Sequence, residues 1–230
     1  MSARGYASAG RSGSGSSSAS ASAITADHRR YKAFWFYKNV LDVDGNGYTN
    51  EDDFVRIALN HAVFFCKGAY FKDIYENYIE TFQNIWRQLS SEADTNQDGI
   101  VCFEEWYAYL QRLQQTGMRS FEELPGYLRE FIEHHFNAYD MNRDGQVDVN
   151  EYRLYLCGRN MDLKMAGACF DALLAGGDRA KGTINKRQFC ALMFDFLFSL
   201  SPDSQGTFLC GPLHSVKHTA IHVYAQLALA

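Results

Sequence analysis

Proline is scarce in this 230-residue chain, which contains only 3 prolines, so long helices can run with few interruptions. No stretch approaches the roughly 18 consecutive apolar residues that a membrane-spanning helix requires. The alternation of apolar and polar residues that marks a half-buried strand is almost absent. We therefore expect an all-α protein without a transmembrane segment.

Strong charge of either sign is also missing. The chain carries 22 Lys and Arg against 27 Asp and Glu, a formal net charge of −5. Nucleic acids and anionic membranes attract basic stripes, so we expect neither as a main partner. The sequence offers no nucleophile paired with a base, no phosphate-binding loop and no acid/base carboxylate pair outside the loops described below. We therefore expect a protein that is not an enzyme.

The cysteines show no CxxC spacing and no compact framework that would indicate disulfides or a zinc site. Six are present: Cys66, Cys102, Cys157, Cys169, Cys190 and Cys210. We interpret them as reduced thiols of a cytosolic protein, mostly small core residues, with redox sensing as the alternative.

The two ends of the chain differ from its middle. Residues 1–23 contain nine Ser, six Ala and four Gly, and such a tract buries too little apolar surface to fold, so we predict a disordered head over 1–27. A weak likeness to a mitochondrial transit peptide is the alternative for this head. In the tail, His214, His218 and His222 would share one helix face, a spacing that we interpret as coincidence rather than as a zinc site.

Between these ends the chain is rich in aromatic residues (17 Phe, 14 Tyr and 3 Trp) and shows helical periodicity. In residues 70–92, apolar side chains recur with the spacing i, i+3, i+4, i+7, which predicts a long amphipathic helix. Similar stripes lie over residues 128–139, 163–174 and 189–197. Gly68, Gly117 and Gly158 fall between stripes and are expected at helix ends. Ser120 and Glu123 suit a capping box, although Pro125 indicates a short turn before the next helix.

Three twelve-residue segments between the helices repeat one pattern of oxygen-bearing side chains with a glycine at position 6. In the first segment, 42–53, the candidate metal-ligating residues are Asp42, Asp44, Asn46, Tyr48 (through its carbonyl) and Asp53. In the second, 94–105, they are Asp94, Asn96, Asp98, Ile100 (carbonyl) and Glu105. In the third, 140–151, they are Asp140, Asn142, Asp144, Gln146 (carbonyl) and Glu151. This is the pattern of an EF-hand Ca²⁺ loop.

The spacing has a physical cause. Ca²⁺ is a hard cation that takes six to eight oxygen ligands, and alternate residues of a tight loop turn their oxygens inward. The glycine at position 6 permits the sharp bend, and a Glu at position 12 can bind with both oxygens. Three Ca²⁺ sites are therefore expected.

The three loops are not equivalent. The third has four carboxylates at ligand positions because Asp148 adds one at position 9, whereas the other two loops have three each. The first ends in Asp53, which is shorter than Glu, so Mg²⁺ should compete best there. The second has Cys102 at position 9, where a hard ion prefers oxygen.

A fourth copy of the pattern has lost its ligands. With Gly182 at position 6, position 1 is Gly177, positions 3 and 5 are Arg179 and Lys181, and position 12 is Gln188. Cations at these places repel a metal ion, so we predict a degenerate, structural hand. We further expect short two-strand pairings, one between Thr49 and Val101 and one between Val147 and Ile184.

Taken together, these motifs resemble the invertebrate sarcoplasmic calcium-binding protein family, and within it the calexcitin-like EF-hand proteins. The likeness covers about residues 28–212. It is carried by the aromatic run 34–37 before the first loop, by the stretch 78–106 around the second, and by the degenerate fourth hand with the ending Gly206, Phe208 and Gly211. The resemblance implies four hands in one compact globule, Ca²⁺ or Mg²⁺ at the first three loops, and a cytoplasmic location.

On this basis we predict two pairs of hands. The first pair spans 28–112, the second spans 113–200 and includes the degenerate loop 177–188, and 201–230 forms a C-terminal segment. The expected function is that of a calcium buffer or sensor. Two alternatives remain open: a target protein gripped by the hands, and a small apolar ligand of the luciferin type held in an aromatic cavity.

Overall fold

The computed structural model describes residues 28–158, 163–174 and 181–213. The expectations for the Ser-rich head, for Gly177 and Arg179, and for the histidines of the tail lie outside these residues.

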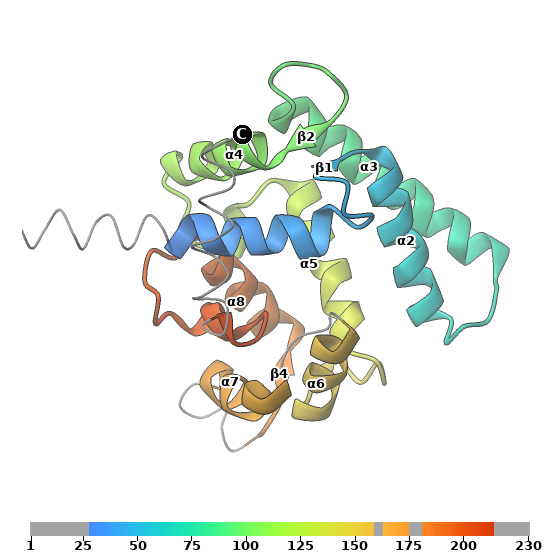
Figure 1. The fold of residues 1–230 in the computed structure, drawn as a ribbon. Helices are drawn as coiled ribbons and strands as arrows, with labels where there is room; N and C mark the ends of the chain where they lie inside the picture. Colours follow the sequence, from blue (N-terminus) through green and yellow to red (C-terminus); the bar gives the residue numbers. More distant parts are fainter. Residues whose placement is uncertain (1–27, 159–162, 175–180, 214–230) are drawn as a thin grey trace, which may run out of the picture.

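The elements follow the chain as four helix–loop–helix units (Figure 1). The first half contains a helix over residues 28–36, which continues as a π-helical turn, and then these elements: η1 (Tyr37–Leu41), β1 (Tyr48–Thr49), α2 (Glu51–Phe65), α3 (Lys72–Ala93), β2 (Val101–Cys102), α4 (Phe103–Gln115) and η2 (Phe121–Glu123). The second half contains α5 (Gly126–Tyr139), β3 (Gln146–Val147), α6 (Val149–Gly158), η3 (Leu163–Met165), α7 (Ala166–Leu173), β4 (Ile184–Asn185), α8 (Lys186–Phe198) and η5 (Gln205–Phe208). Apart from the four two-residue strands, the regular secondary structure of the described residues is helical, as the sequence predicted.

The long helix expected over 70–92 is α3, and its apolar stripe is buried along one face at Tyr78, Phe82, Ile85, Trp86 and Leu89. None of the described helices is long and apolar enough to cross a membrane.

Helix ends also follow the sequence. Gly68 and Gly117 lie in the turns that follow α2 and α4 and have φ angles of 81° and 83°, a region that favours glycine. Before α5 the chain makes the short turn η2, and Pro125 is the N-cap of α5. The hydroxyl of Ser120 makes no capping hydrogen bond, so the capping box suggested there does not form.

The loops pair as predicted. In the first antiparallel pairing Thr49 is opposite Val101, and in the second Val147 is opposite Ile184. The hydroxyl of Tyr37 adds a further link, because it donates to the carbonyl of Val101 at 2.8 Å and also lies 3.2 Å from the carbonyl of Gly47. Each of the loops 42–53, 94–105 and 140–151 is thus held against a neighbouring loop.

One hydrophobic core joins both halves of the molecule. The helix of residues 28–36 runs through the middle of the fold, with α2, α3 and α4 to one side and α7 and α8 to the other (Figure 1). Its last residue, Phe36, is fully buried and contacts the rings of Trp106, Phe131 and Phe196 at centroid distances of 5.9, 6.3 and 6.5 Å. Such aromatic pairs each stabilise a fold by about 0.5–1.5 kcal/mol. The helix of residues 28–36 therefore stabilises the contact between the two halves.

All six cysteines are free thiols, and four of them are buried, which agrees with the interpretation of most cysteines as core residues. Burial raises the pKa of Cys190 to about 12. That thiol therefore stays protonated and unreactive at neutral pH.

Candidate metal centres

Each of the three loops is closed by a hydrogen bond that its position-1 carboxylate accepts. The glycine N–H at position 6 points to that carboxylate in every case: Gly47 to Asp42 at 3.3 Å, Gly99 to Asp94 at 3.0 Å, and Gly145 to Asp140 at 3.0 Å. These glycines have φ angles of 97°, 84° and 80°, so the bend is one that other residues rarely adopt.

The side chains at positions 3 and 5 fold back into the loop, where each accepts from the backbone N–H two residues further on. In the first loop, Asn46 N donates to Asp44 and Tyr48 N donates to Asn46, at 3.1 and 3.0 Å. The second and third loops repeat the pattern at 2.8–3.0 Å. The side chains at positions 3 and 5 are therefore held within the loop by its own backbone.

The position-12 side chain ties the two ends of each loop together. One carboxylate oxygen accepts from the N–H of position 9: Asn50 to Asp53 at 3.0 Å, Cys102 to Glu105 at 3.0 Å, and Asp148 to Glu151 at 3.1 Å. The other oxygen accepts from N–H groups near the start of the loop, at 3.0–3.3 Å. All three carboxylates are buried, so backbone dipoles hold them where a cation would be bound.

The first loop brings its acids closest together. One oxygen from each of Asp42, Asp44 and Asp53 lies within 4.8 Å of the other two. Asp42 is only 3% exposed, and its Oδ1 is buried without a hydrogen-bond partner. An ionised carboxylate oxygen in that position is costly unless a cation or donor meets it. The residue set therefore fits a divalent cation that takes oxygen ligands.

This loop also has a cation of its own, which the sequence pattern did not indicate. The Lys38 ammonium lies 2.6 Å from Oδ2 of Asp42, and its side chain is 42% exposed. The pair forms across the π-helical turn Tyr37–Leu41, in which the N–H of Asp42 bonds to the carbonyl of Tyr37, five residues earlier. The N–H groups of Asp94 and Asp140 instead bond four residues earlier, as in an ordinary α-helix. Single π turns inside helices often occur at functional sites.

Among the position-12 carboxylates, the pKa values of Asp53 and Glu105 are shifted in opposite directions. Burial raises the pKa of Asp53, and the hydrogen bonds from Asn50, Asp44 and Val43 offset only part of that effect. Burial acts in the same direction on Glu105, but its hydrogen bonds with Cys102 and Thr95 outweigh it and lower the pKa of Glu105 below its ordinary value. The surroundings therefore favour the protonated form of Asp53 and the ionised form of Glu105.

The side chain at position 9 caps the outgoing helix in two of the loops, a role that the ligand pattern alone does not indicate. Asp148 Oδ1 accepts from the N–H groups of Asn150 and Glu151 at 2.7 and 2.9 Å, which caps the first turn of α6. In the first loop, Asn50 caps α2 in the same way. Cys102 stands at the corresponding place in the second loop, and burial raises the pKa of its thiol, so this position carries no charge there.

The fourth hand keeps the scaffold without the acids. Gly182 has a φ of 65°, and Ile184 is buried in its pairing with the third loop. Gln188 still bonds back to position 9, since Asn185 N donates to its side-chain oxygen at 2.9 Å. Lys181 is exposed where the other loops have an amide or carboxylate at position 5.

Comparison with known proteins agrees with these features. A family model described as EF hand matches residues 91–110 and 132–156, which contain the second and third loops. The alpha chain of the sarcoplasmic calcium-binding protein of Penaeus vannamei is 28% identical over 180 residues, covering 77% of this chain and 92% of that protein. Sarcoplasmic calcium-binding protein 1 of Astacus leptodactylus is also 28% identical over 180 residues, which is 77% of this chain and 93% of that protein.

Among solved structures, a sarcoplasmic calcium-binding protein from amphioxus has a similar fold. Its TM-score is 0.71 at 22% identity, and the match covers 81% of this chain and 98% of that one. The resemblance to the sarcoplasmic calcium-binding proteins that the sequence motifs indicated is confirmed: the chain has homologues among them over most of its length, the EF-hand model matches its second and third loops, and its fold is similar to that of the amphioxus protein.

Proposed function

We propose that this protein binds Ca²⁺ reversibly at its first three loops and acts as a calcium buffer or sensor. The observation that carries the proposal is the buried, unpartnered Oδ1 of Asp42 beside the converging carboxylates of Asp44 and Asp53. The relatives in Penaeus and Astacus, whose names describe calcium-binding proteins, support the same role for this chain.

The proposed ligands are those of the sequence pattern. Each loop supplies side-chain oxygens from positions 1, 3, 5 and 12 and a backbone carbonyl from position 7, with Asp53, Glu105 and Glu151 at position 12. Such an all-oxygen set suits a hard cation. Because Asp53 is one methylene shorter than Glu, the first loop is the place where Mg²⁺ should compete most effectively.

We further propose that the chain acts by binding and not by catalysis, in the cytoplasm, with residues 28–112 and 113–200 as its two pairs of hands. The strand pairings are consistent with this division, since each of them joins two loops of the same proposed pair.

A luciferin-type ligand inside the core finds little room in the described residues. The cavity lined by Phe36, Trp106, Phe131 and their neighbours measures about 10 Å³. Pockets that hold organic ligands usually measure roughly 300–1,000 Å³. We therefore propose that the aromatic core holds no such ligand and that the protein acts through calcium binding at its loops.

Calcium titration calorimetry on the full chain tests the proposal. We expect three equivalents of Ca²⁺ at saturation, and two after Glu105→Gln, since this change removes one carboxylate and keeps the size of the side chain. Gln188→Ala is the matched control at position 12 of the fourth hand and should leave three. No calcium binding would overturn the proposed function, and four equivalents would overturn the assignment of the fourth hand.

A further inference from the structure

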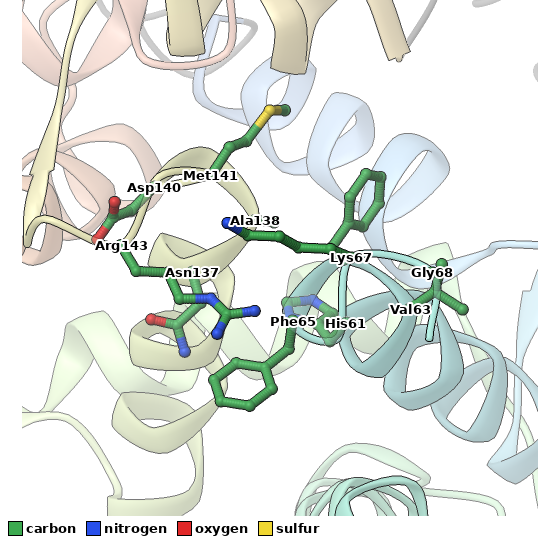
Figure 2. A pocket seen from close by; sticks show the side chains of 11 residues that line it. His61, Val63, Phe65, Lys67, Gly68, Asn137, Ala138, Asp140, Met141 and Arg143 are labelled. Atoms are coloured by element: carbon green, nitrogen blue, oxygen red, sulfur yellow. The ribbon is translucent and has the colours of Figure 1, made fainter. Parts of the chain in front are cut away.

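A hollow lies where the C-terminal end of α2 faces the end of α5 and the start of the third loop, and Asp140, Met141 and Arg143 of that loop line it (Figure 2). Its volume is about 550 Å³, within the roughly 300–1,000 Å³ range of pockets that bind organic molecules. We call it the α2–α5 hollow and define it by six of its lining residues: His61, Phe64, Phe65, Lys67, Met141 and Arg143.

Much of the wall is apolar and open to solvent. Phe64 is 58% exposed and Phe65 is 37% exposed, and Val63, which also lines the hollow, is 44% exposed. Three large apolar side chains exposed in succession at the end of one helix exceed the scattered exposure that is normal on a protein surface. Contiguous apolar surface of this kind is typical of a place where another molecule binds.

Two cations project into the hollow from opposite walls. Figure 2 shows the side chains of Lys67, at the end of α2, and Arg143, in the third loop, reaching over the space above His61. The Arg143 guanidinium lies 4.1 Å from the ring centroid of Phe65. Within the described part of the chain, neither cation forms an ion pair with an acidic side chain. In a protein of net charge −5, this is a local positive site beside an apolar wall.

A second cavity adjoins the α2–α5 hollow. This cavity of about 690 Å³ shares His61, Phe64, Ala138 and Met141 with the hollow and extends toward Leu154 of α6. Leu154 is itself 56% exposed. A ligand can therefore place a charged end at Lys67 and Arg143 and extend an apolar body past Phe64.

We propose that the α2–α5 hollow binds a small amphipathic anion, a molecule with an apolar body and one carboxylate or similar head. The apolar body packs on Phe64, Phe65 and Met141, and the head accepts charge-assisted hydrogen bonds from Lys67 and Arg143. The charge of the rim selects an anion over a neutral or cationic amphiphile. Asp140, the first ligand position of the third loop, also lines the hollow, so binding is measured both with and without calcium.

Dodecanoate, used below its micellar concentration, is the probe, and dodecan-1-ol is its neutral counterpart. Calorimetry on the full chain, with calcium and with a chelator, should show saturable binding of one dodecanoate and at least tenfold weaker binding of the alcohol. No saturable binding of dodecanoate in either condition overturns the proposal and leaves the calcium assignment intact. Binding of an acidic amphipathic peptide in place of dodecanoate would also overturn it, in favour of a docking surface for proteins.

Variants locate the site. Lys67→Gln combined with Arg143→Gln should weaken dodecanoate at least tenfold and leave the alcohol unchanged. Glutamine is compatible with the backbone at 143, because Gln97 occupies the same position of the second loop with a φ of 60° against 64° for Arg143. The matched control, Arg56→Gln with Lys72→Gln, removes the same charge from α2 and α3 outside the hollow. An equal loss in the control would show that net charge, and not this site, binds the anion.

The apolar wall has its own pair of variants. Phe64→Ser should weaken dodecanoate and dodecanol alike, because both place their chains on this ring. Phe71→Ser is the matched control, since Phe71 is 54% exposed and does not line the hollow. Equal affinities for Phe64→Ser and the unmodified protein would contradict the proposed position of the apolar body.

Discussion

The Lys38 ammonium lies 2.6 Å from Oδ2 of Asp42, the first ligand position of the first loop, and thus places an internal positive charge beside a proposed metal site. The corresponding side chains four residues before Asp94 and Asp140 are Ser90 and Phe136, so the other two loops have no such charge. The first loop is therefore partly neutralised before any metal binds.

We predict that Lys38→Met tightens calcium binding at the first loop about tenfold, which corresponds to roughly 1.4 kcal/mol. Two unit charges about 4 Å apart near a protein surface interact by about 4 kcal/mol. The Lys38 side chain is 42% exposed, so solvent removes much of this effect. The same variant should lower the melting temperature in chelator, because Asp42 loses its partner. Calorimetry and thermal unfolding measure the two effects.

Lys72→Met is the control for this experiment, because Lys72 forms an exposed pair with Glu76 at the same i, i+4 spacing, away from the loops. Lys72→Met should change neither the calcium affinity of the first loop nor the melting temperature in chelator, apart from the small effect of net charge. Weaker calcium binding in Lys38→Met would mean that the lysine positions Asp42 for the metal instead of competing with it.

The pKa shifts predict how the loops respond to acid. A carboxylate must lose its proton before it binds a cation. The pKa of Asp53 is raised by burial, whereas that of Glu105 is lowered by its hydrogen bonds. The folded structure therefore favours the proton on Asp53 and disfavours it on Glu105, and we predict that the first loop loses calcium at a higher pH than the second. Site-resolved NMR titration of Gly47 and Gly99 amides in calcium measures the order, and simultaneous loss would contradict it.

The order of calcium affinity among the three loops is a separate prediction. The third loop has four carboxylates, and we expect it to fill first and to bind most tightly. Glu151→Gln should eliminate the tightest binding step, whereas Asp53→Ala should leave it in place. Asp53→Glu should raise the preference of the first loop for Ca²⁺ over Mg²⁺ because the longer side chain can supply two oxygens. If Asp53→Ala removed the tightest binding step instead, the close spacing of the three acids in the first loop would matter more for affinity than the number of carboxylates in the third.

Much of this arrangement could be predicted from the sequence because it depends on local spacing. The bend at position 6 and the pairing of Thr49 with Val101 both follow from one twelve-residue pattern. The long helix α3 follows from its apolar stripe. These features need no knowledge of how distant segments pack.

The features that escaped prediction depend on backbone details or on distant contacts. The π turn before Asp42 adds one residue to a helical turn, and the spacing of apolar residues in the sequence does not indicate this extra residue. The reach of Lys38 depends on this turn. The α2–α5 hollow depends on how closely the end of α2 packs against α5, which spacing along the chain cannot give.

The C-terminal segment gives a stability prediction that does not involve metal. Gly206 in η5 lies directly on α8, and a Cβ atom at this position would be 2.3 Å from the carbonyl oxygen of Leu192 and 2.5 Å from the backbone nitrogen of Phe196. Both are backbone atoms of a buried helix and cannot move aside easily. The N–H of Gly206 also donates to Oδ2 of Asp195 at 2.5 Å, which fixes the segment in place.

Gly206→Ala should therefore destabilise the protein by about 1–3 kcal/mol, the usual cost of forcing extra atoms into a packed site. For a domain of this size each kcal/mol lowers the melting temperature by roughly 2–4 °C. Gly126→Ala is the matched control, since no atom lies within 4 Å of its added Cβ and its φ is not positive. It should be neutral or slightly stabilising because alanine restricts the unfolded chain. Thermal unfolding in chelator measures both variants, and equal melting temperatures would show that η5 does not pack on α8 as described.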